Sequence, residues 1–286
     1  MVASGDVTAG RLRRSDSFAA AQQAASKVPQ ITVYFWIIKI LTTAQGEATS
    51  DYLVYKIDPF IAAGIGFVAL VAALAIQFRA RQYVAWRYWL AVDLVAIFGT
   101  MAADGMHIKL HIPYAASTAF FAIVLTVVFV AWYLTEKTLS IHSIRTPRRE
   151  AFYWAAVLAT FALGTALGDM TATTLHLGYL ASGIMFTVIF FIPGIGYRWL
   201  RLNAIVAFWF AYVVTRPLGA SYADWMGVPK IVGGLGFGRG PVAIGLSIPI
   251  VALVAYLAVT RRDVEPAVAP SPQAPSAPPA RGRHRA

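Results

Sequence analysis

Four tryptophans in this chain each follow an aromatic residue and precede, without any gap, a glycine ten residues later and an aspartate fifteen residues later. Self-similarity at a fixed spacing is the signature of a repeat architecture. A chain of this kind is expected to fold as copies of one unit. The four sets are Trp36, Gly46 and Asp51; Trp89, Gly99 and Asp104; Trp154, Gly164 and Asp169; and Trp209, Gly219 and Asp224.

The surroundings of these repeats are very apolar. The chain has 58% hydrophobic and only 13% charged residues, with a mean hydropathy of +0.63, which is typical of an integral membrane protein. The sequence predicts an all-α membrane protein with eight transmembrane helices, since each apolar run is close to the ~20 residues that a crossing needs. The runs lie near 31–50, 59–78, 86–105, 113–135, 151–170, 177–197, 203–223 and 241–260.

Each repeat has room for two helices and two loops. Because every unit contains an even number of crossings, the sequence predicts four parallel helical hairpins in a pseudo-fourfold arrangement, with no soluble domain. The proline- and alanine-rich C-terminus is typical of a disordered tail. The expected segments are a cytoplasmic arm at 1–28, a membrane domain at 29–262 with repeats at about 29–80, 81–140, 148–200 and 203–262, and a disordered cytoplasmic tail at 263–286.

The chain has a net charge of +11, but the distribution of its basic residues follows membrane topology and does not indicate nucleic-acid binding. Most basic residues fall in the N-terminal arm, in the loops after even-numbered helices and in the tail, so the positive-inside rule predicts that both termini are cytoplasmic. The absence of cysteine excludes disulfides and thiolate metal sites. The polar N-terminal region does not resemble a signal peptide, so the first helix is expected to be retained.

Helical geometry places the polar residues of the odd-numbered helices on one stripe. At 100° per residue, positions four, seven, eleven and fifteen after each tryptophan lie within about 60° of it. A charge at the bilayer centre costs about 2.5 to 3.5 kcal/mol, so this stripe is expected to face protein or water. Its members are Asp93 at plus four; Thr43 and Arg216 at plus seven; Glu47, Thr100 and Thr165 at plus eleven; and the four aspartates at plus fifteen.

If the four odd-numbered helices surround one axis, the repeated aspartates form a ring near its external end. A ring of this kind attracts cations, and Asp51, Asp104, Asp169 and Asp224 are the expected binding residues, with Glu47, Thr100 and Thr165 below them. A structural alternative is that aspartate and glycine end or cap each helix while the tryptophan anchors it at the membrane interface. In that case the glycine is a packing contact.

Three deeper charged residues break the repeat. Lys39, Asp93 and Arg216 each occur in a single copy and are expected to gate or couple transport. A structural alternative is a buried Asp93–Arg216 or Asp93–Lys39 ion pair. Pro217 removes a backbone hydrogen bond and is expected to open its helix, which would make that helix the moving part.

Carboxylates, threonine hydroxyls and imidazoles suit Mn²⁺, Mg²⁺ or Zn²⁺. The four aspartates are the main candidate metal ligands, and His107 and His176 are weaker ones, since they lie near the external helix ends. A lone histidine there is more often an interfacial residue than a ligand. No tight ligand motif selects one metal.

The chain resembles a bacterial family of uncharacterised membrane proteins built from four tandem two-helix repeats of unknown function with an aromatic–tryptophan pair. The resemblance covers about residues 27–262 and implies the fold and a bacterial inner-membrane location, but no substrate. It is carried by KVPQITVYFWIIKILTTAQGEATSD at 27–51, EAFYWAAVLATFALGTALGD at 150–169 and FWFAYVVTRPLGASYAD at 208–224. The second copy departs most, with Asp93 and the run GTMAAD at 99–104.

The leading hypothesis is a cation transporter or permease in the lipid bilayer whose substrate is a divalent metal, with coupling of transport to protons as an option. One alternative is a transporter of a small organic solute, with Arg216 pairing with a carboxylate or phosphate. A non-transporting scaffold or sensor is another. An intramembrane enzyme with Glu47 and an aspartate as acid and base is disfavoured, since no nucleophile or HExxH motif is present. The oligomeric state is left open.

Overall fold

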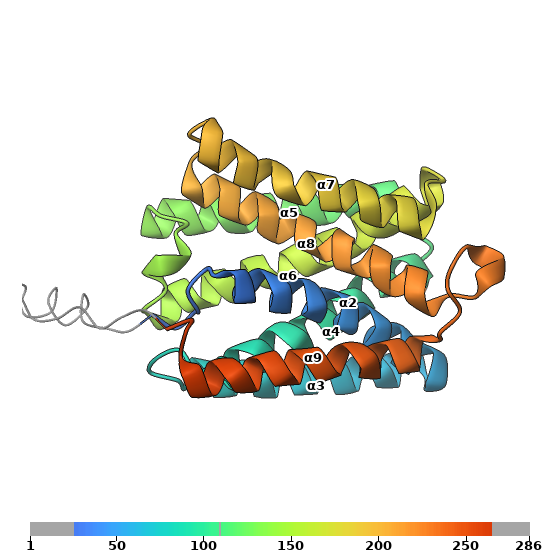
Figure 1. Cartoon of the computed structure of the whole chain (residues 1–286), viewed down its shortest axis with the longest axis horizontal. Coiled ribbons are helices and arrows are strands. Elements are labelled where there is room, and N and C mark those ends of the chain that lie inside the picture. The colour runs from blue at the N-terminus through green and yellow to red at the C-terminus, as the bar shows by residue number, and fades with distance from the viewer. Residues whose placement is uncertain (1–25, 109, 265–286) are drawn as a thin grey trace, which may run out of the picture.

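The computed structural model describes residues 26–108 and 110–264, so the arm up to residue 25, Lys109 and the tail from residue 265 lie outside it. The predicted all-helical fold is confirmed for the described residues, which contain eight long α-helices (Figure 1). These are α2 (Val33–Lys56), α3 (Pro59–Phe78), α4 (Ala85–Ile108), α5 (Tyr114–Glu136), α6 (Pro147–Asp169), α7 (Gly178–Trp199), α8 (Ala204–Gly227) and α9 (Arg239–Thr260). Shorter elements are η1 (Ile141–Ser143), the π-helical η2 (Met170–Thr174) and η3 (Lys230–Val232).

Polar caps fix where several of these helices begin. The Thr32 side chain accepts a hydrogen bond from the backbone N–H of Phe35 at the start of α2, and Asn203 does the same for α8. Asp58 caps α3 directly before a proline at the first helical position, a combination that satisfies free N–H groups and fixes φ. The apolar runs therefore become helices with defined ends.

The four inner helices α2, α4, α6 and α8 form a closed ring of contacts. In this ring α2 packs against α4, α4 against α6, α6 against α8, and α8 against α2. Each of these four helices is the first helix of one predicted repeat. The polar stripe of every repeat is therefore brought to one shared interior.

The four outer helices follow a shifted pattern. Each packs mainly against the inner helix of the next repeat: α3 against α4, α5 against α6, and α7 against α8. The last outer helix, α9, closes the circle by packing against α2, the first inner helix, as Figure 1 shows for the lower part of the bundle. Each repeat therefore completes the packing of its neighbour.

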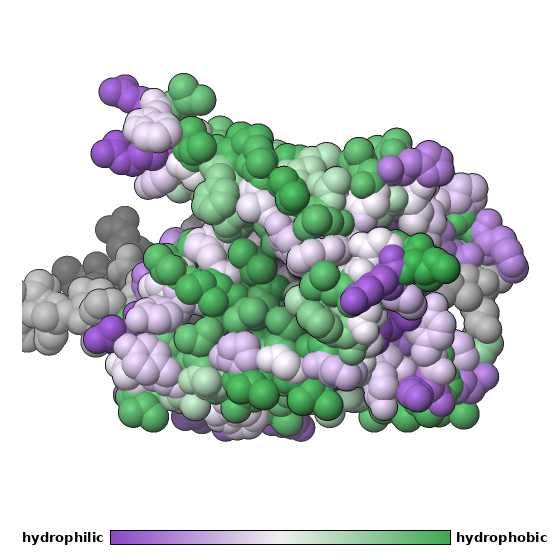
Figure 2. Space-filling view, turned by 45° about the vertical axis from the view of Figure 1, so that its right-hand side comes forward, coloured by the Kyte–Doolittle hydropathy of each residue, from purple (hydrophilic) through white to green (hydrophobic). Residues whose placement is uncertain are grey.

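Seven of the described helices are long and apolar enough to cross a membrane, and α2 is not among them. The charges of Lys39, Glu47 and Asp51 lower the hydropathy of α2, but Lys39 and Glu47 are buried inside the bundle. In each outer helix 22% of the most apolar 18-residue stretch is buried, compared with 56% to 72% in α4, α6 and α8. Figure 2 accordingly shows apolar side chains over much of the outer surface. The chain is a multi-pass membrane protein.

The two ends of the described chain meet on one side of the bundle. The backbone N–H of Gln30 donates to the carbonyl of Asp263 at 2.9 Å, and the Tyr83 hydroxyl donates to the Asp263 carboxylate at 2.5 Å. Burial raises the pKa of Asp263 above its ordinary value. Nearby, the Lys27 ammonium pairs with the buried Glu150 carboxylate at 2.6 Å. This end of the bundle is therefore closed by packed polar contacts.

Candidate functional site

The repeated aromatic–tryptophan pairs meet in one layer, which we call the aromatic floor: Phe35, Trp36, Tyr88, Trp89, Tyr153, Trp154, Phe208 and Trp209. The first aromatic residue of each pair contacts the tryptophan of the next repeat, and Phe208 closes the circle on Trp36. The four ring-centroid distances lie between 5.6 and 6.2 Å. The prediction that the tryptophans anchor the helices at the interface is wrong for Trp89, Trp154 and Trp209, which are buried in the core.

The repeated glycines let each inner helix approach the next. A Cβ added at Gly99 would lie 2.9 Å from the Phe161 Cβ, and one added at Gly46 would collide with Ala96. In the same way, Gly164 faces Arg216 and Gly219 faces Thr43. In all four cases the partner stands seven residues after the tryptophan of the next repeat. The interpretation of the glycines as packing contacts is therefore confirmed.

Above the floor lies a buried layer of unequal polar residues, which we call the polar layer: Glu47, Thr100, Thr165 and Arg216, one from each inner helix. The Nη2 atom of Arg216 donates to the carboxylate of Glu47 and to the hydroxyl of Thr100, and it donates to the hydroxyl of Thr165 at 2.6 Å. The fourth residue at the plus-eleven position is Ala220, which is small and also buried. Arg216 therefore occupies a cation position lined by one carboxylate and two hydroxyls.

The aspartates lie one helical turn beyond the polar layer, about 6 Å along the helix axis. Carboxylate oxygens of Glu47, Asp51 and Asp104 all lie within 4.8 Å of one another, and we call these three residues the acidic group. Asp169 interacts electrostatically with Glu47, Asp51 and Asp224, so the other two aspartates face the same region. All four aspartates are partly exposed. Of the four predicted aspartates, Asp51 and Asp104 come together with Glu47, and Asp169 and Asp224 are not members of this group.

Three of the four aspartates do not end their α-helices, and the helical winding also continues after the fourth. Helix α2 continues past Asp51 to Lys56, α4 past Asp104 to Ile108, and α8 past Asp224 to Gly227. After Asp169 the chain winds on as the π-helical η2. The alternative in which these carboxylates serve as helix terminators is therefore wrong.

The deeper charged residues do not pair as predicted. The Lys39 ammonium has no hydrogen-bond partner in the described part of the chain and lies 4.1 Å from the Phe161 ring centroid and 4.3 Å from that of Tyr212. The Asp93 Oδ1 atom is also without a partner there. Arg216 bonds Glu47 instead of Asp93, because the rotation of neighbouring helices, which helical angle alone does not give, decides which residues meet.

Two further predictions about this region are wrong. Pro217 does not open its helix, since α8 runs without a break from Ala204 to Gly227. The histidines do not join the acidic group: the His107 ring lies 3.6 Å from that of Tyr114 and within 3.1 Å of the Ser117 hydroxyl, and His176 is exposed in the loop after η2. No imidazole of the described residues therefore belongs to this group.

An arginine outside the predicted stripe also reaches the acidic group. Arg239, the first residue of α9, donates from Nε to the Asp51 carboxylate at 2.5 Å. Sequence reasoning missed this residue because it follows a glycine-rich loop and has no place in the repeat. The only available signal was its position as a basic residue at the external end of a helix.

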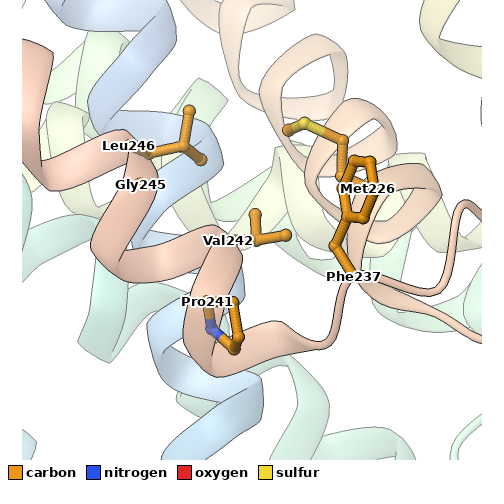
Figure 3. Close-up of a pocket in the computed structure, with 6 residues that line it drawn as sticks. All are labelled: Met226, Phe237, Pro241, Val242, Gly245 and Leu246. Atoms are coloured by element: carbon orange, nitrogen blue, oxygen red, sulfur yellow. The ribbon is translucent and has the colours of Figure 1, made fainter.

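A separate pocket of about 400 Å³ lies beside the start of α9. Figure 3 shows Met226 of α8 and Phe237 of the preceding loop facing Val242 on α9. The six lining residues carry no charge or hydrogen-bonding side chain, so this pocket has no donor set for an ion. The polar chemistry of the molecule is concentrated between the inner helices.

The chain belongs to the family described as Repeat of Unknown Function (DUF347). The family model matches four successive segments, at residues 34–83, 87–138, 152–202 and 207–263, which confirms the four tandem repeats. Each matched segment contains one inner and one outer helix. Neither a curated protein nor a solved structure matches the chain.

Proposed function

We propose that this chain is a membrane permease for a divalent cation, which binds at the acidic group formed by Glu47, Asp51 and Asp104. The observation that carries the proposal is the approach of these three carboxylates to within 4.8 Å of one another inside an apolar bundle. Like charges at this spacing repel one another, so they favour a ligand that neutralises them. Asp169 and Asp224 add two further carboxyl groups to the same region.

The proposed membrane arrangement has all eight long helices crossing the bilayer around a pseudo-fourfold axis. It is supported by the closed circle of helix contacts and by the burial of the charges of α2 in the interior. Basic residues in the loops on the side where the described ends meet favour a cytoplasmic position for that side. We assign the protein to the inner membrane of a bacterium, with the acidic group toward the external side.

The donor set favours a hard divalent ion. Carboxylate and hydroxyl oxygens suit Mg²⁺ or Mn²⁺, and no thiolate is available. Protons compete with a metal for carboxylates, so proton-coupled exchange is compatible with this set of ligands.

In this proposal Arg216 is the inner gate. Its Nη2 atom occupies the position between Glu47, Thr100 and Thr165 that a cation moving inward would need. Below it, the Lys39 side chain and the closed apolar layer of the aromatic floor stand in the same path. Passage therefore requires Arg216 to release Glu47.

The test uses cells that lack or overproduce the protein. Metal content and metal tolerance are measured with Asp51→Asn, Asp104→Asn and Glu47→Gln, each of which is expected to abolish the effect of the intact protein. Asp58→Asn is the matched control, because this exposed aspartate caps α3 and asparagine caps a helix equally well. Unchanged metal handling in the three site variants would contradict the proposal, and a loss of protein level alone would favour a scaffold.

A second candidate, transport of a small organic anion, is favoured by one specific observation. The Nε and Nη1 atoms of Arg216 and the Nζ atom of Lys39 are buried without a partner in the described part of the chain. Buried donors of this kind are costly unless a ligand or water satisfies them. If an anion is the substrate, Lys39→Gln and Arg216→Gln abolish its uptake while Asp104→Asn leaves it unchanged.

A further inference from the structure

Arg239, at the start of α9, brings a second guanidinium to the acidic group. Its Nε atom lies 2.5 Å from Oδ2 of Asp51, and Asp51 is one of the three carboxylates that approach one another. Glu47, another member, is held by Arg216. Two of the three proposed metal ligands are therefore already paired with cations belonging to the protein itself.

The backbone before Arg239 is shaped to deliver this side chain. Gly233, Gly236 and Gly238 adopt positive φ angles of 89°, 78° and 86°, which residues with a Cβ rarely adopt. The loop is pinned to the end of α8 by backbone hydrogen bonds, including Leu235 N–H to the Trp225 carbonyl at 2.7 Å. Glycine is therefore required where the loop turns back over the external end of the bundle.

The side chain of Arg239 is guided but not locked. Its guanidinium lies 4.4 Å from the ring centroid of Tyr55, a residue of the last turn of α2. The side chains of Arg239 and Asp51 are 28% and 17% exposed, whereas those of Arg216 and Glu47 are 0% and 4% exposed. Breaking a buried ion pair leaves an unpaired charge and costs more than breaking a partly exposed one, so water and ions compete for the outer pair more readily than for the inner one.

We propose that Arg239 is a tethered competitor that sets the cation selectivity of the acidic group: an entering ion must displace its guanidinium from Asp51. The inference rests on the proposed function and adds a selectivity residue to it. A divalent ion interacts with several carboxylates at once and carries twice the charge of Na⁺ or K⁺. It therefore displaces the guanidinium where a monovalent ion does not.

The test is a calorimetric titration of the purified full-length protein in detergent with Mn²⁺, repeated in the presence of K⁺. Arg239→Gln is expected to bind Mn²⁺ about three- to fivefold more tightly, the gain from removing a partly exposed ion pair, and to be inhibited by K⁺ more than the intact protein. Arg239→Lys, which keeps the positive charge, is expected to resist inhibition by K⁺ as the intact protein does, unlike Arg239→Gln. Lys230→Gln, an exposed change in the same connection, is the control and is expected to behave as the intact protein.

The outcomes distinguish a failure of the Arg239 proposal from a failure of the proposed function. If Arg239→Gln and Lys230→Gln bind Mn²⁺ with equal affinity and equal sensitivity to K⁺, while Asp51→Asn binds weakly, the competitor role is overturned and the cation site stands. If neither the intact protein nor Arg239→Gln binds Mn²⁺, both proposals are overturned.

Discussion

The aromatic floor and the polar layer are built by the same four helices at different heights, yet they differ in symmetry. In the floor each repeat contributes an equivalent pair, and four similar ring contacts close the circle. In the polar layer the repeats contribute Glu47, Thr100, Thr165 and Arg216, which are chemically unequal. Residues that are equivalent in all repeats therefore hold the helices together, whereas residues that differ between repeats carry the polar chemistry.

This division has a physical reason. Aromatic packing depends on buried area and shape, which four equivalent contacts supply evenly around a ring. Four identical charges in a buried layer would repel one another, so a buried polar layer is stable only when opposite charges and hydrogen-bonding partners are combined. The break in symmetry at Glu47 and Arg216 is therefore what allows charge to remain in the interior.

The largest expected effect concerns the polar layer. Arg216→Met leaves the Glu47 carboxylate buried and unpaired, so we expect a loss of about 3 to 5 kcal/mol in the free energy of unfolding. Adding Glu47→Leu removes the orphaned charge and is expected to restore most of this stability without restoring metal transport. The comparison is made by thermal unfolding in detergent, and equal stabilities of the single and double variants would contradict a buried pair.

The next effect tests the floor. Trp154→Ala removes a buried ring and its contact with Tyr88, so we expect the free energy of unfolding to fall by about 3 to 5 kcal/mol. Mn²⁺ affinity of the folded fraction should be unchanged, because the floor touches no proposed ligand. Trp199→Ala, at a position that is 71% exposed, is the control for losing an indole. A metal-binding defect in Trp154→Ala would contradict the claim that the aromatic floor has no part in metal binding.

A smaller effect is expected at the repeated glycines, where neighbouring inner helices approach closely. Gly164→Ala places a methyl group 2.9 Å from the Pro217 Cδ and against the Arg216 side chain, so overpacking should cost about 1 to 3 kcal/mol of stability. Gly194→Ala, in outer helix α7 with open space around it, should be neutral. Equal melting temperatures for the two variants would show that the inner helices can separate freely.

The smallest expected effect concerns Asp263, on the side of the bundle where the two described ends meet. An aspartate whose pKa is raised by folding stabilises the fold at low pH, and this contribution is lost as the pH rises through the folded pKa. Burial raises the pKa of Asp263, so the melting temperature should fall slightly from about pH 4 upward, and Asp263→Asn should flatten that dependence. A profile identical to that of the intact protein would remove Asp263 as the cause.

The regular part of the molecule was accessible from sequence. The fixed spacing of tryptophan, glycine and aspartate identifies the four units, and helical angle brings Glu47, Thr100, Thr165 and Arg216 onto converging faces. Partners across helices were not accessible, since the pairing of Arg216 with Glu47 rather than Asp93 depends on helix rotation. Arg239 was missed for a different reason: a glycine-rich loop, not a periodic pattern, places it beside Asp51.

Mn²⁺ flux into proteoliposomes that contain the purified protein tests the proposed cation path most directly. We expect flux through the intact protein and through Asp58→Asn, and only background flux through a folded triple variant with Glu47→Gln, Asp51→Asn and Asp104→Asn. Equal flux through the triple variant and the intact protein would contradict the central claim that these three carboxylates form the path of the cation.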